Sequence, residues 1–422
     1  MSKILYSIPT SNTLALDSHT FADIHAETKR KQTIFRNISR STRVYFTWDS
    51  SFDYITTLLA IVAEQSIAIP ANPIINENHE TVDAVFTKNK LTVKKNPTQH
   101  FFADIILFTS GSTNEPKAIY LSENNLLYNA KTIYTLLDPD VRLQSLVTSN
   151  LYYILGLSTQ LLMPLVNKGR VISAQNKAFS TLPQEMKKHD INFIAGVPLF
   201  YKKLLKESTD RAPIKYAIIG GASWNSELIK EVFERFAVRP ASTYGLTETS
   251  PILAFSNRHK KQFVGNVIPG SKIEIVSGEI YVSGPGVAKY IQIGTEIEKI
   301  DGWYPTGDLG KLQGTEVYYI GRKKELINKG GIKISPSIVE MHFLRLPGVE
   351  DCVAGPVFSK AYGEDIGIIY TGKLQSAKTL ATLPRHYRPK ISICRKQLPT
   401  LSASKKVDRK QIRQTLRKIQ QE

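Results

Sequence analysis

The sequence predicts an α/β protein with more than one domain. Its 422 residues are enough for two or three domains with sizeable cores. Residues 43–70 read as a strand, an apolar helix and a second strand, and a unit of this kind predicts parallel pairing. A further apolar run, Ile105–Phe108, reads as a buried strand that leads into a loop of small polar residues. These observations favour a sheet covered by helices.

Composition indicates a reduced, cytoplasmic enzyme. The apolar content is 42%, and no apolar run reaches the roughly 18 to 20 residues that span a bilayer. Residues 1–20 make a poor signal peptide. The two cysteines, Cys352 and Cys394, give neither a disulfide framework nor metal-ligand spacing. The net charge is +18, heaviest toward the C-terminus, which predicts either a solvated basic face or attraction to polyanions.

The loop after Phe108 has the composition of a phosphate-binding loop. It supplies the hydroxyls of Thr109, Ser110, Ser112 and Thr113, while Gly111 lets main chain approach a ligand closely. Backbone N–H groups and hydroxyls in such a loop form an anion-binding concavity, and Lys117 adds a positive charge. It is not a Walker A loop, because Lys117 is followed by Ala118 rather than by Ser or Thr. The alternative is a polar surface turn.

The following segments carry weaker signals when each is taken alone. Ser122 is a plausible N-cap for a helix. Tyr152 and Tyr153 could line a pocket, or be two aromatics in a core. Residues 195–198 read as a strand end before an amphipathic helix, and residues 272–294 read as β-rich with a hairpin. The run 216–223 reads as a buried strand that ends in two glycines.

Taken in order, these segments resemble the adenylate-forming enzymes, which include acyl-CoA synthetases, luciferases and the adenylation domains of peptide synthetases. Thr-Ser-Gly-Ser-Thr-x-x-Pro-Lys at 109–117 is similar to their phosphate loop, with departures at Asn114 and Ala118. Residues 244–248, Tyr-Gly-Leu-Thr-Glu, and residues 302–310, Gly-Trp-Tyr-Pro-Thr-Gly-Asp-Leu-Gly, follow in the family's order. The resemblance covers residues 43–409, and the early phosphate loop implies an abbreviated N-terminal region.

The resemblance implies a site for ATP and Mg²⁺. The loop residues, with Lys117, would hold the β,γ-phosphates; Thr247 would contact a phosphate oxygen, and Glu248 would bind Mg²⁺, which prefers carboxylate and phosphate oxygens. Asp308 would accept hydrogen bonds from the ribose hydroxyls, as an ionised carboxylate can. The residues implied to contact nucleotide or CoA are Thr109, Ser110, Gly111, Ser112, Thr113, Gly221, Tyr244 (stacking on adenine), Gly245, Asp308, Arg322, Gly330 and Gly331.

The resemblance also implies a large domain, residues 1–321, and a small mobile domain, residues 322–422. The large domain would be α/β with layered sheets and a small β-barrel subdomain, and the small domain α+β. Lys324 falls at the family's interdomain pivot, and Gly330 and Gly331 fall in the loop that lines the pantetheine tunnel. Aligning Val407-Asp408-Arg409 with the family's terminal motif makes Lys406 the catalytic lysine, with Lys405 as the alternative.

The implied activity is AMP-forming ligation of a carboxylic acid to a thiol. Lys117, Thr247, Glu248 and Lys406 would be the catalytic residues, and the thiol would belong to CoA. No Asp occurs between Asn150 and Gly156, where family members that activate α-amino acids pair it with the ammonium, so a fatty or aromatic acid is favoured. Two alternatives stay open: loading of an acidic carrier protein, and a catalytically decayed basic binding protein, to which a nucleic acid would bind in a salt-sensitive way.

Overall fold

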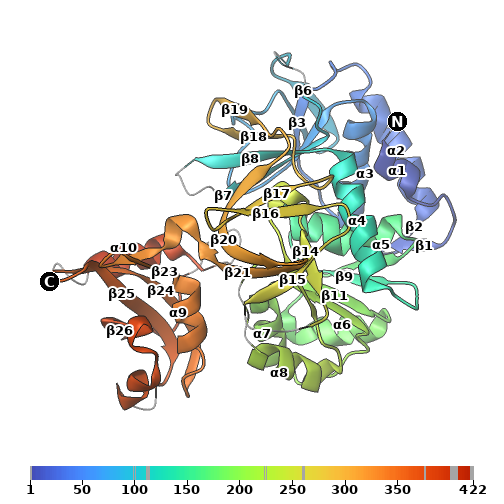
Figure 1. The fold of residues 1–422 in the computed structure, drawn as a ribbon. Coiled ribbons are helices and arrows are strands. Elements are labelled where there is room, and N and C mark those ends of the chain that lie inside the picture. Colours follow the sequence, from blue (N-terminus) through green and yellow to red (C-terminus); the bar gives the residue numbers. More distant parts are fainter. Residues whose placement is uncertain are drawn as a thin grey trace. The chain divides into compact units, whose positions relative to one another are not determined.

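The chain forms two compact units. The computed structural model describes residues 2–97, 99, 101–110, 115–222, 224, 226–258, 262–374, 377–399 and 407–418 (Figure 1). The large unit comprises Met1–Lys260, Val264–Ile273 and Val282–Tyr304, and the small unit comprises Lys261–Phe263, Glu274–Tyr281 and Pro305–Glu422. The predicted domain boundary, between residues 321 and 322, marks where the part expected to be mobile begins. This boundary stays a prediction.

An eight-stranded sheet in the large unit carries the phosphate-loop segment. Its middle strands are parallel and pair in the order β7, β4, β3, β5. The predicted strand–helix–strand unit at residues 43–70 is confirmed, because β3 and β4 pair in parallel, with Arg43 opposite Ile67. In sheet order the strands are β19 (Glu296–Lys299), β18 (Tyr290–Ile293), β8 (Pro116–Leu121), β7 (Ile105–Ser110), β4 (Ile67–Pro70), β3 (Arg43–Phe46), β5 (Ala84–Thr87) and β6 (Lys90–Val93).

A second sheet of the large unit brings several candidate residues to the carboxyl ends of its strands. Strands β10, β9, β11, β12 and β13 run in parallel, and β14 and β15 continue the sheet in antiparallel fashion. The order is β15 (Phe263–Val267), β14 (Ala254–Ser256), β13 (Ala241–Tyr244), β12 (Tyr216–Ile219), β11 (Phe193–Gly196), β9 (Gln144–Val147), β10 (Arg170–Ser173), β1 (Leu14–Leu16) and β2 (His19–Thr20). Ligands of open α/β sheets bind at the carboxyl ends of such strands.

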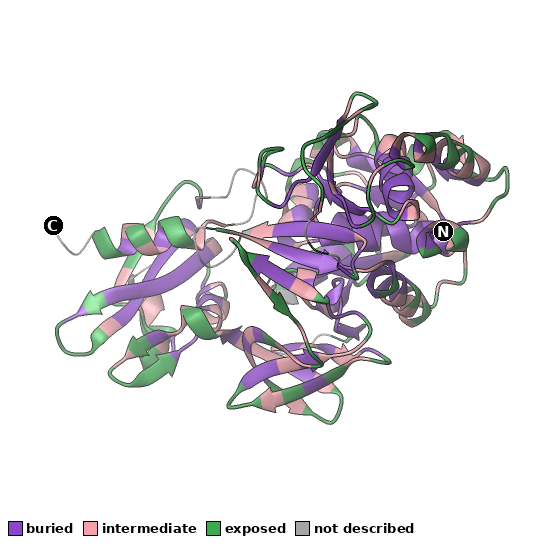
Figure 2. Ribbon diagram, turned by 90° about the horizontal axis from the view of Figure 1, so that it is seen from above, coloured by how far each residue is buried: buried purple, intermediate pink, exposed green. Residues whose placement is uncertain are grey.

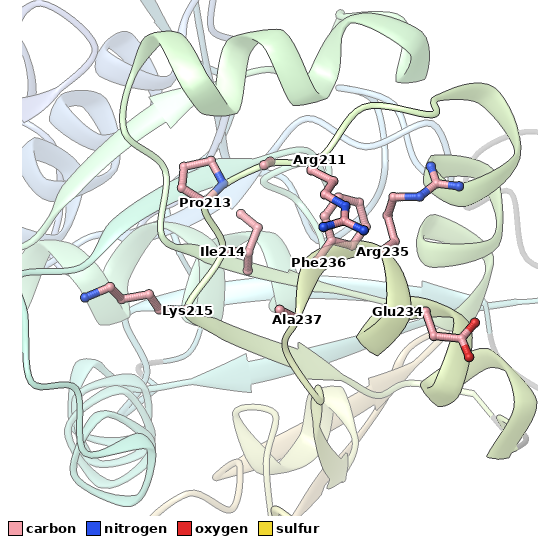
Figure 3. Close-up of a pocket in the computed structure, with 9 residues that line it drawn as sticks. Arg211, Pro213, Ile214, Lys215, Glu234, Arg235, Phe236 and Ala237 are labelled. Carbon is pink, nitrogen blue, oxygen red and sulfur yellow. The ribbon is translucent and has the colours of Figure 1, made fainter.

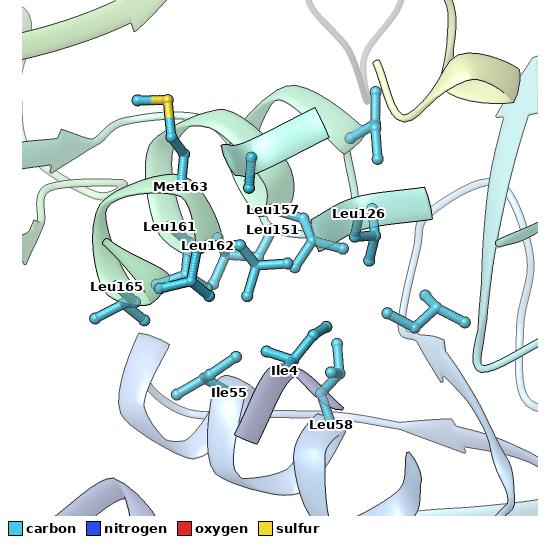
Figure 4. Packing of buried hydrophobic residues seen from close by; sticks show 14 of the residues in the cluster. Ile4, Ile55, Leu58, Leu126, Leu151, Leu157, Leu161, Leu162, Met163 and Leu165 are labelled. Carbon is cyan, nitrogen blue, oxygen red and sulfur yellow. The ribbon is translucent and has the colours of Figure 1, made fainter. Parts of the chain in front are cut away.

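Helices of the large unit bury their apolar faces in two separate hydrophobic clusters. Helix α3 is apolar nearly all round, with residues 54–62 buried, as expected of a helix packed on more than one side. Figure 4 shows Ile55 and Leu58 of this helix among Ile4, Leu126 and Leu161 from distant parts of the chain. The helices are α1 (Lys3–Ser7), α2 (Phe21–Phe35), α3 (Ser51–Ala63), α4 (Glu123–Leu137), the π-helical turn η1 (Leu155–Leu162), α5 (Met163–Val166), η2 (Phe179–Thr181), α6 (Leu182–Lys188), α7 (Pro198–Glu207), α8 (Ser226–Phe236) and η3 (Thr247–Thr249).

The predicted start of helix α4 is confirmed. The hydroxyl of Ser122 accepts a hydrogen bond from the N–H of Asn125 at 3.2 Å, and the Asn125 side chain accepts one from the N–H of Ser122 at 2.8 Å. These reciprocal bonds satisfy backbone donors that the first turn of a helix leaves without partners. Helix α4 therefore begins directly after β8.

The small unit combines part of one sheet with a five-stranded sheet. In the first, the strand order is β16 (Lys272–Val276), β17 (Glu279–Ser283), β20 (Tyr304–Gln313) and β21 (Glu316–Arg322). The second has the order β23 (Ile332–Ile334), β22 (Ile327–Lys329), β25 (Gly363–Gly372) and β24 (Val349–Ser359), with β26 (Ile391–Cys394) also on β25. The helices are η4 (Lys323–Glu325), α9 (Pro336–Phe343), η5 (Ala377–Thr382), η6 (Arg385–Tyr387) and α10 (Arg409–Lys418).

The predicted β-rich segment at residues 272–294 is divided between sheets. Strands β16 and β17 form the predicted hairpin, which turns at Gly278 with a φ of +82°. Strand β18 instead pairs with β8 in the eight-stranded sheet. Many strand residues are buried (Figure 2), whereas the edge strands β6 and β19 are mostly exposed. Within the described residues, no helix is both long enough and apolar enough to cross a bilayer.

Candidate functional site

Lys117 and Glu248 meet in the large unit. Strand β8 holds Lys117 between Thr109 of β7 and Ile293 of β18. Glu248 lies in the short turn η3, between β13 and β14. The Lys117 Nζ lies 2.8 Å from the Glu248 Oε1, and the two side chains are only 19% and 11% exposed. The cation predicted for phosphate and the carboxylate predicted for Mg²⁺ are therefore direct neighbours.

Tyr304 is the third member of this group. Its hydroxyl accepts a hydrogen bond from the Lys117 Nζ at 2.8 Å and donates one to the Glu248 Oε1 at 3.2 Å. The Nζ of Lys117 also lies 5.3 Å from the centre of the Tyr304 ring, within range of a cation–π interaction. Sequence reasoning missed this residue, although it belongs to the Gly-Trp-Tyr-Pro-Thr-Gly-Asp segment from which Asp308 was chosen. The signal that could have identified Tyr304 as a site residue was its place in that motif.

The phosphate-loop residues are only partly described. Strands β7 and β8 form an antiparallel hairpin in which Thr109 pairs with Lys117 and Ser110 pairs with Pro116. Gly111, Ser112 and Thr113 lie outside the described residues, so their predicted contacts with phosphate stay predictions. Thr109 and Lys117 are side by side on the hairpin, which supports the prediction that the two act on one ligand.

The segment 244–251 is tightly packed around Gly245. A Cβ on Gly245 would lie 1.7 Å from the carbonyl oxygen of Pro251, so no other residue fits there. The Thr249 hydroxyl accepts a hydrogen bond from the N–H of Leu246 at 3.0 Å and so fixes the turn that carries Thr247 and Glu248. Tyr244 ends β13 and is 8% exposed. Gly245 thus has a packing role, and its predicted contact with nucleotide stays a prediction.

Gly221 follows β12, next to this segment. Its φ is +75°, a left-handed conformation that favours glycine. A Cβ on the preceding Gly220 would lie 2.1 Å from the Thr243 Oγ1, so the chain here runs directly against β13. The ends of β12 and β13 therefore lie together at one edge of the sheet, as the predicted adenine site requires.

Asp308 and Arg322 form an ion pair in the small unit. They are opposite each other on β20 and β21, and the Arg322 Nε lies 2.7 Å from the Asp308 Oδ1. Asp308 is 1% exposed, while the Arg322 side chain is 43% exposed. Burial, followed by the effect of the Asp308 carboxylate, raises the pKa of the neighbouring Tyr319 hydroxyl. A buried carboxylate suits Asp308, which is predicted to accept hydrogen bonds from ribose, and the neighbouring cation suits Arg322, which is predicted to contact the nucleotide.

Gly330 and Gly331 form the turn of the β22–β23 hairpin. Their φ angles are +58° and +88°, so both positions favour glycine. The N–H of Gly330 donates to the carbonyl oxygen of Tyr362 at 3.0 Å, and a Cβ on Gly330 would lie 3.0 Å from the Tyr362 ring. Lys324 lies in the short turn η4 before this hairpin. The geometry of the turn explains why glycine occurs at both positions. Their contact with the pantetheine arm of CoA stays a prediction.

Lys405 and Lys406 lie outside the described residues. The residues on either side are held together, because the N–H of Asp408 donates to the carbonyl oxygen of Pro399 at 2.8 Å. Arg409 makes two hydrogen bonds to the Glu340 carboxylate, at 2.7 and 2.8 Å. Burial by itself would lower the pKa of Arg409, but the Glu340 charge outweighs it and the pKa is raised. The choice between the two lysines stays open.

Tyr152 belongs to an aromatic cluster. It is 8% exposed, and its ring centre lies 4.5 Å from that of Tyr153 and 6.5 Å from that of Trp48. Its hydroxyl accepts a hydrogen bond from the Asn150 side chain at 2.8 Å. These contacts favour the core alternative for Tyr152, since its ring and its hydroxyl both have protein partners.

A surface hollow of the large unit lies away from these residues. It has a volume of about 350 Å³ and is lined by Arg211–Lys215 and Glu234–Ala237 (Figure 3). Ile214 and Lys215 precede β12, whereas Gly220 and Gly221 follow it. The hollow is therefore at the opposite end of the strand from the candidate site, and it plays no part in the proposed chemistry.

Comparisons with known proteins identify the family. The family described as AMP-binding enzyme matches residues 88–291. A sulfoacetate–CoA ligase of Cupriavidus necator is 29% identical over 349 residues, which cover 77% of this chain and 67% of that one. Residues 88–291 of this chain are an AMP-binding enzyme domain of the adenylate-forming family. The predicted family is thus confirmed.

A further relative of this AMP-binding enzyme is also named for the formation of a CoA thioester. A feruloyl-CoA synthase from an Amycolatopsis species is 27% identical over 62% of this chain and 57% of its own length. The chain therefore spans between about half and two thirds of the curated relatives it matches here. Among solved structures, o-succinylbenzoate CoA synthetase of Bacillus subtilis, in complex with its acyl-adenylate, superposes with a TM-score of 0.82, 22% identity and 98% coverage of both chains. ATP-bound MatB of Rhodopseudomonas palustris gives a TM-score of 0.83 at 19% identity, with 99% and 100% coverage. The predicted fold class is confirmed.

The donor set of this AMP-binding enzyme fits Mg²⁺ bound together with a nucleotide. Among the described residues, no group of three or more His, Cys, Asp or Glu side chains could hold a metal ion by itself. Mg²⁺ in nucleotide sites is usually held by one or two carboxylates together with substrate phosphates. Glu248 offers such a carboxylate, and Lys117 offers a cation for the phosphates. When bound, the metal neutralises phosphate charge.

Proposed function

We propose that this AMP-binding enzyme is an acid–CoA ligase that proceeds through an acyl-adenylate. The observation that carries the proposal is the contact of Lys117 with Glu248 and Tyr304, because it joins the phosphate-loop segment to the predicted metal-binding segment. The relatives support it, since they include ligases named for sulfoacetate–CoA and feruloyl-CoA.

The first half-reaction forms the acyl-adenylate. A carboxylate oxygen of the acid attacks the α-phosphorus of ATP, a new P–O bond forms, and the bond to pyrophosphate breaks. Thr109, Ser110 and Lys117 hold the departing phosphates, and Lys406 stabilises the charge shared by the carboxylate and the α-phosphate. Positioning and charge stabilisation dominate chemistry of this kind, because little covalent work is left to protein groups.

The second half-reaction transfers the acyl group to the CoA thiol. The thiolate sulfur attacks the acyl carbon, the C–O bond to AMP breaks, and AMP leaves with the electron pair. Asp308 and Arg322 hold the ribose through both steps. The Gly330–Gly331 turn lies beside the pantetheine arm, where main chain without side chains leaves room for it.

The acid is proposed to be fatty or aromatic and not an α-amino acid. No Asp occurs in residues 150–156, where a buried carboxylate would be needed to pair with an ammonium group. The relatives act on acids as different as sulfoacetate and ferulate, so they do not narrow the class further.

The test is acid-dependent release of pyrophosphate and AMP. Purified enzyme is given ATP, Mg²⁺, CoA and in turn fatty, aromatic, short and α-amino acids. The proposal expects AMP and a CoA thioester with at least one acid of the first two groups and none with α-amino acids. Replacing CoA by an acyl carrier protein tests the alternative acceptor. Release of no AMP with any acid would overturn the proposal.

A further inference from the structure

Two neighbouring hairpin tips of the small unit expose large apolar side chains. Ile332, Phe358 and Tyr362 are 63%, 61% and 51% exposed, and we refer to them as the hairpin-tip patch. Ile332 begins β23, whereas Phe358 and Tyr362 flank the turn between β24 and β25. Lys329 pairs with both Ile332 and Gly363, so the two tips lie at the same end of the five-stranded sheet. The three exposed side chains of the patch therefore lie at one end of this sheet.

Lysines surround the hairpin-tip patch. Lys333, Lys360 and Lys390 are exposed, and the Lys390 Nζ donates to the carbonyl oxygen of Phe358 at 3.2 Å. The Lys329 Nζ lies 5.6 Å from the centre of the Tyr362 ring and 2.6 Å from the Asp365 carboxylate, so it neutralises that buried charge.

The acidic residues nearby do not cancel this charge. Glu364, which accepts a hydrogen bond from the N–H of Asn328 at 2.7 Å, offsets one of the three exposed lysines, and Asp365 is already paired with Lys329. Beyond the tips, residues 373–422 contain fourteen Lys and Arg and two acidic residues, so they hold +12 of the chain's +18. The small unit thus combines protruding apolar side chains with a strongly positive field.

We propose that the hairpin-tip patch docks this protein on an anionic lipid surface. Aromatic side chains are favoured at the boundary between headgroups and acyl chains, and each nearby lysine adds attraction to anionic lipid. Three protruding side chains are too few for a stable protein–protein interface, which buries about 800 Å² on each partner. A bilayer needs no matching pocket, so small protruding tips are sufficient.

The basic helix α10 does not offer an alternative way of inserting into lipid. Its apolar residues Ile412 and Leu416 are both fully buried, in a cluster with Val353 and Ile369 of strands β24 and β25. Only its polar and charged residues face solvent. Helix α10 therefore contributes charge, and the hairpin tips contribute the apolar contact.

The test is sedimentation of the full chain with vesicles, without substrates. One set of vesicles contains phosphatidylcholine alone, and the other contains phosphatidylcholine mixed with phosphatidylglycerol. We expect binding to the anionic vesicles only, with release at high salt because surface charges are screened. Replacing the patch (Ile332→Ser, Phe358→Ser and Tyr362→Ser together) should weaken binding at least about tenfold, as should Lys333→Gln with Lys360→Gln and Lys390→Gln.

Matched controls come from the large unit. Phe102 is 85% exposed, so Phe102→Ser removes an exposed aromatic elsewhere. Lys88 and Lys90 are exposed around the turn of the β5–β6 hairpin, so Lys88→Gln with Lys90→Gln removes two hairpin lysines outside the patch. Both controls should bind vesicles as the unaltered protein does. A loss in either control equal to that of the patch variants would show that vesicle binding does not depend on the patch in particular, and would overturn the proposal.

Three further results would also overturn it. The first is no binding of the unaltered protein to anionic vesicles. The second is unchanged vesicle binding by patch variants whose thermal melting shows that they are folded. The third is a patch variant that keeps its vesicle binding but loses affinity for CoA or for an acidic carrier protein, which would assign the patch to the thiol acceptor. The ligase could fail every substrate screen and the vesicle result would still stand.

Discussion

At the scale of single residues, the candidate site depends on the pairing of two side chains 131 positions apart in sequence. The Lys117 ammonium is confined by the Glu248 carboxylate and the Tyr304 hydroxyl, each 2.8 Å away. Because Glu248 is shared between Lys117 and Tyr304, a change in any one of the three alters the position or charge of the other two. Because the three residues are coupled, their roles can be compared by single substitutions that remove either a charge or only a hydroxyl.

Removal of the Glu248 charge should impair adenylation. Glu248→Gln keeps the shape but removes the carboxylate proposed for Mg²⁺ and leaves Lys117 without its counter-charge. We expect a loss of roughly 10²- to 10³-fold in acid-dependent pyrophosphate release, the usual cost of removing one such charge-stabilising group. The concentration of Mg²⁺ at half-maximal rate should rise as well.

Asp308→Asn is the control variant for the Glu248→Gln experiment. It should raise the KM for ATP through the loss of ribose contacts and leave the Mg²⁺ dependence as it was. If Glu248→Gln changes the KM for ATP alone, with an unaltered Mg²⁺ requirement, Glu248 is not the metal-binding carboxylate.

The Tyr304 hydroxyl should have a smaller effect than Glu248. Tyr304→Phe keeps the ring over Lys117 and removes only the hydroxyl, and one hydrogen bond to a charged group contributes about 1.5 kcal/mol, or roughly tenfold in rate. We expect kcat for adenylation to fall by about that factor with little change in thermal stability. Tyr318→Phe is the control, since that hydroxyl bonds Glu316 at 2.6 Å on strand β21. An equal loss in both variants would exclude a positioning role for Tyr304.

At the scale of elements, local sequence patterns predicted the elements but not the contacts between distant ones. The strand–helix–strand unit at residues 43–70 and the cap at Ser122 follow from neighbouring residues, and both are confirmed. Strand β18 could not be assigned to a sheet in this way, because its partner β8 lies about 170 residues earlier, where Tyr290 pairs with Tyr120. Tyr304 was missed for the same reason. Its partners are brought to it only by folding.

The corner between α1 and α4 is a long-range contact with a testable pH dependence. The buried Glu123 carboxylate accepts hydrogen bonds from the N–H groups of Lys3 and Ile4, at 2.8 and 2.9 Å, and from the Ser2 hydroxyl. Burial raises the pKa of Glu123 in spite of these bonds, and the Asp104 carboxylate raises it further. Folding therefore favours the protonated form. The resulting contribution to stability is present below the unfolded pKa of about 4.3 and is lost as the pH rises through the folded pKa.

Glu123→Gln should remove that pH dependence. Gln resembles the protonated carboxyl, so the variant and the unaltered protein should have similar melting temperatures near pH 4, and the variant should gain relative stability as the pH rises to about 7. Thermal melting of both proteins across this range measures the difference. Parallel curves would mean that the carboxylate is not penalised by burial.

At the scale of the whole molecule, the residues predicted to bind nucleotide are divided between the two units. Lys117, Glu248 and Tyr304 belong to the large unit, whereas Asp308 and Arg322 belong to the small one. Sequence order was enough to name Lys117, Glu248, Asp308 and Arg322 as candidates, because their motifs occur as short contiguous segments, but it did not name Tyr304. It was not enough to choose between Lys405 and Lys406, because both precede Val407-Asp408-Arg409 and differ by one position only.

The two lysines can be separated by assaying the two half-reactions independently. If Lys406 stabilises the charge shared by the acid and the α-phosphate, Lys406→Ala should abolish acid-dependent exchange of pyrophosphate into ATP. The same variant should still form thioester from supplied acyl-adenylate and CoA, because that step needs no attack on phosphorus. If Lys406 acts in only one half-reaction, the small domain (residues 322–422) must move between the two half-reactions. Lids and domains move between steps in many enzymes. Lys405→Ala should affect neither half-reaction strongly. A selective loss of exchange in Lys405→Ala would shift the assignment by one residue, and an equal loss of both half-reactions in Lys406→Ala would contradict a role confined to adenylation.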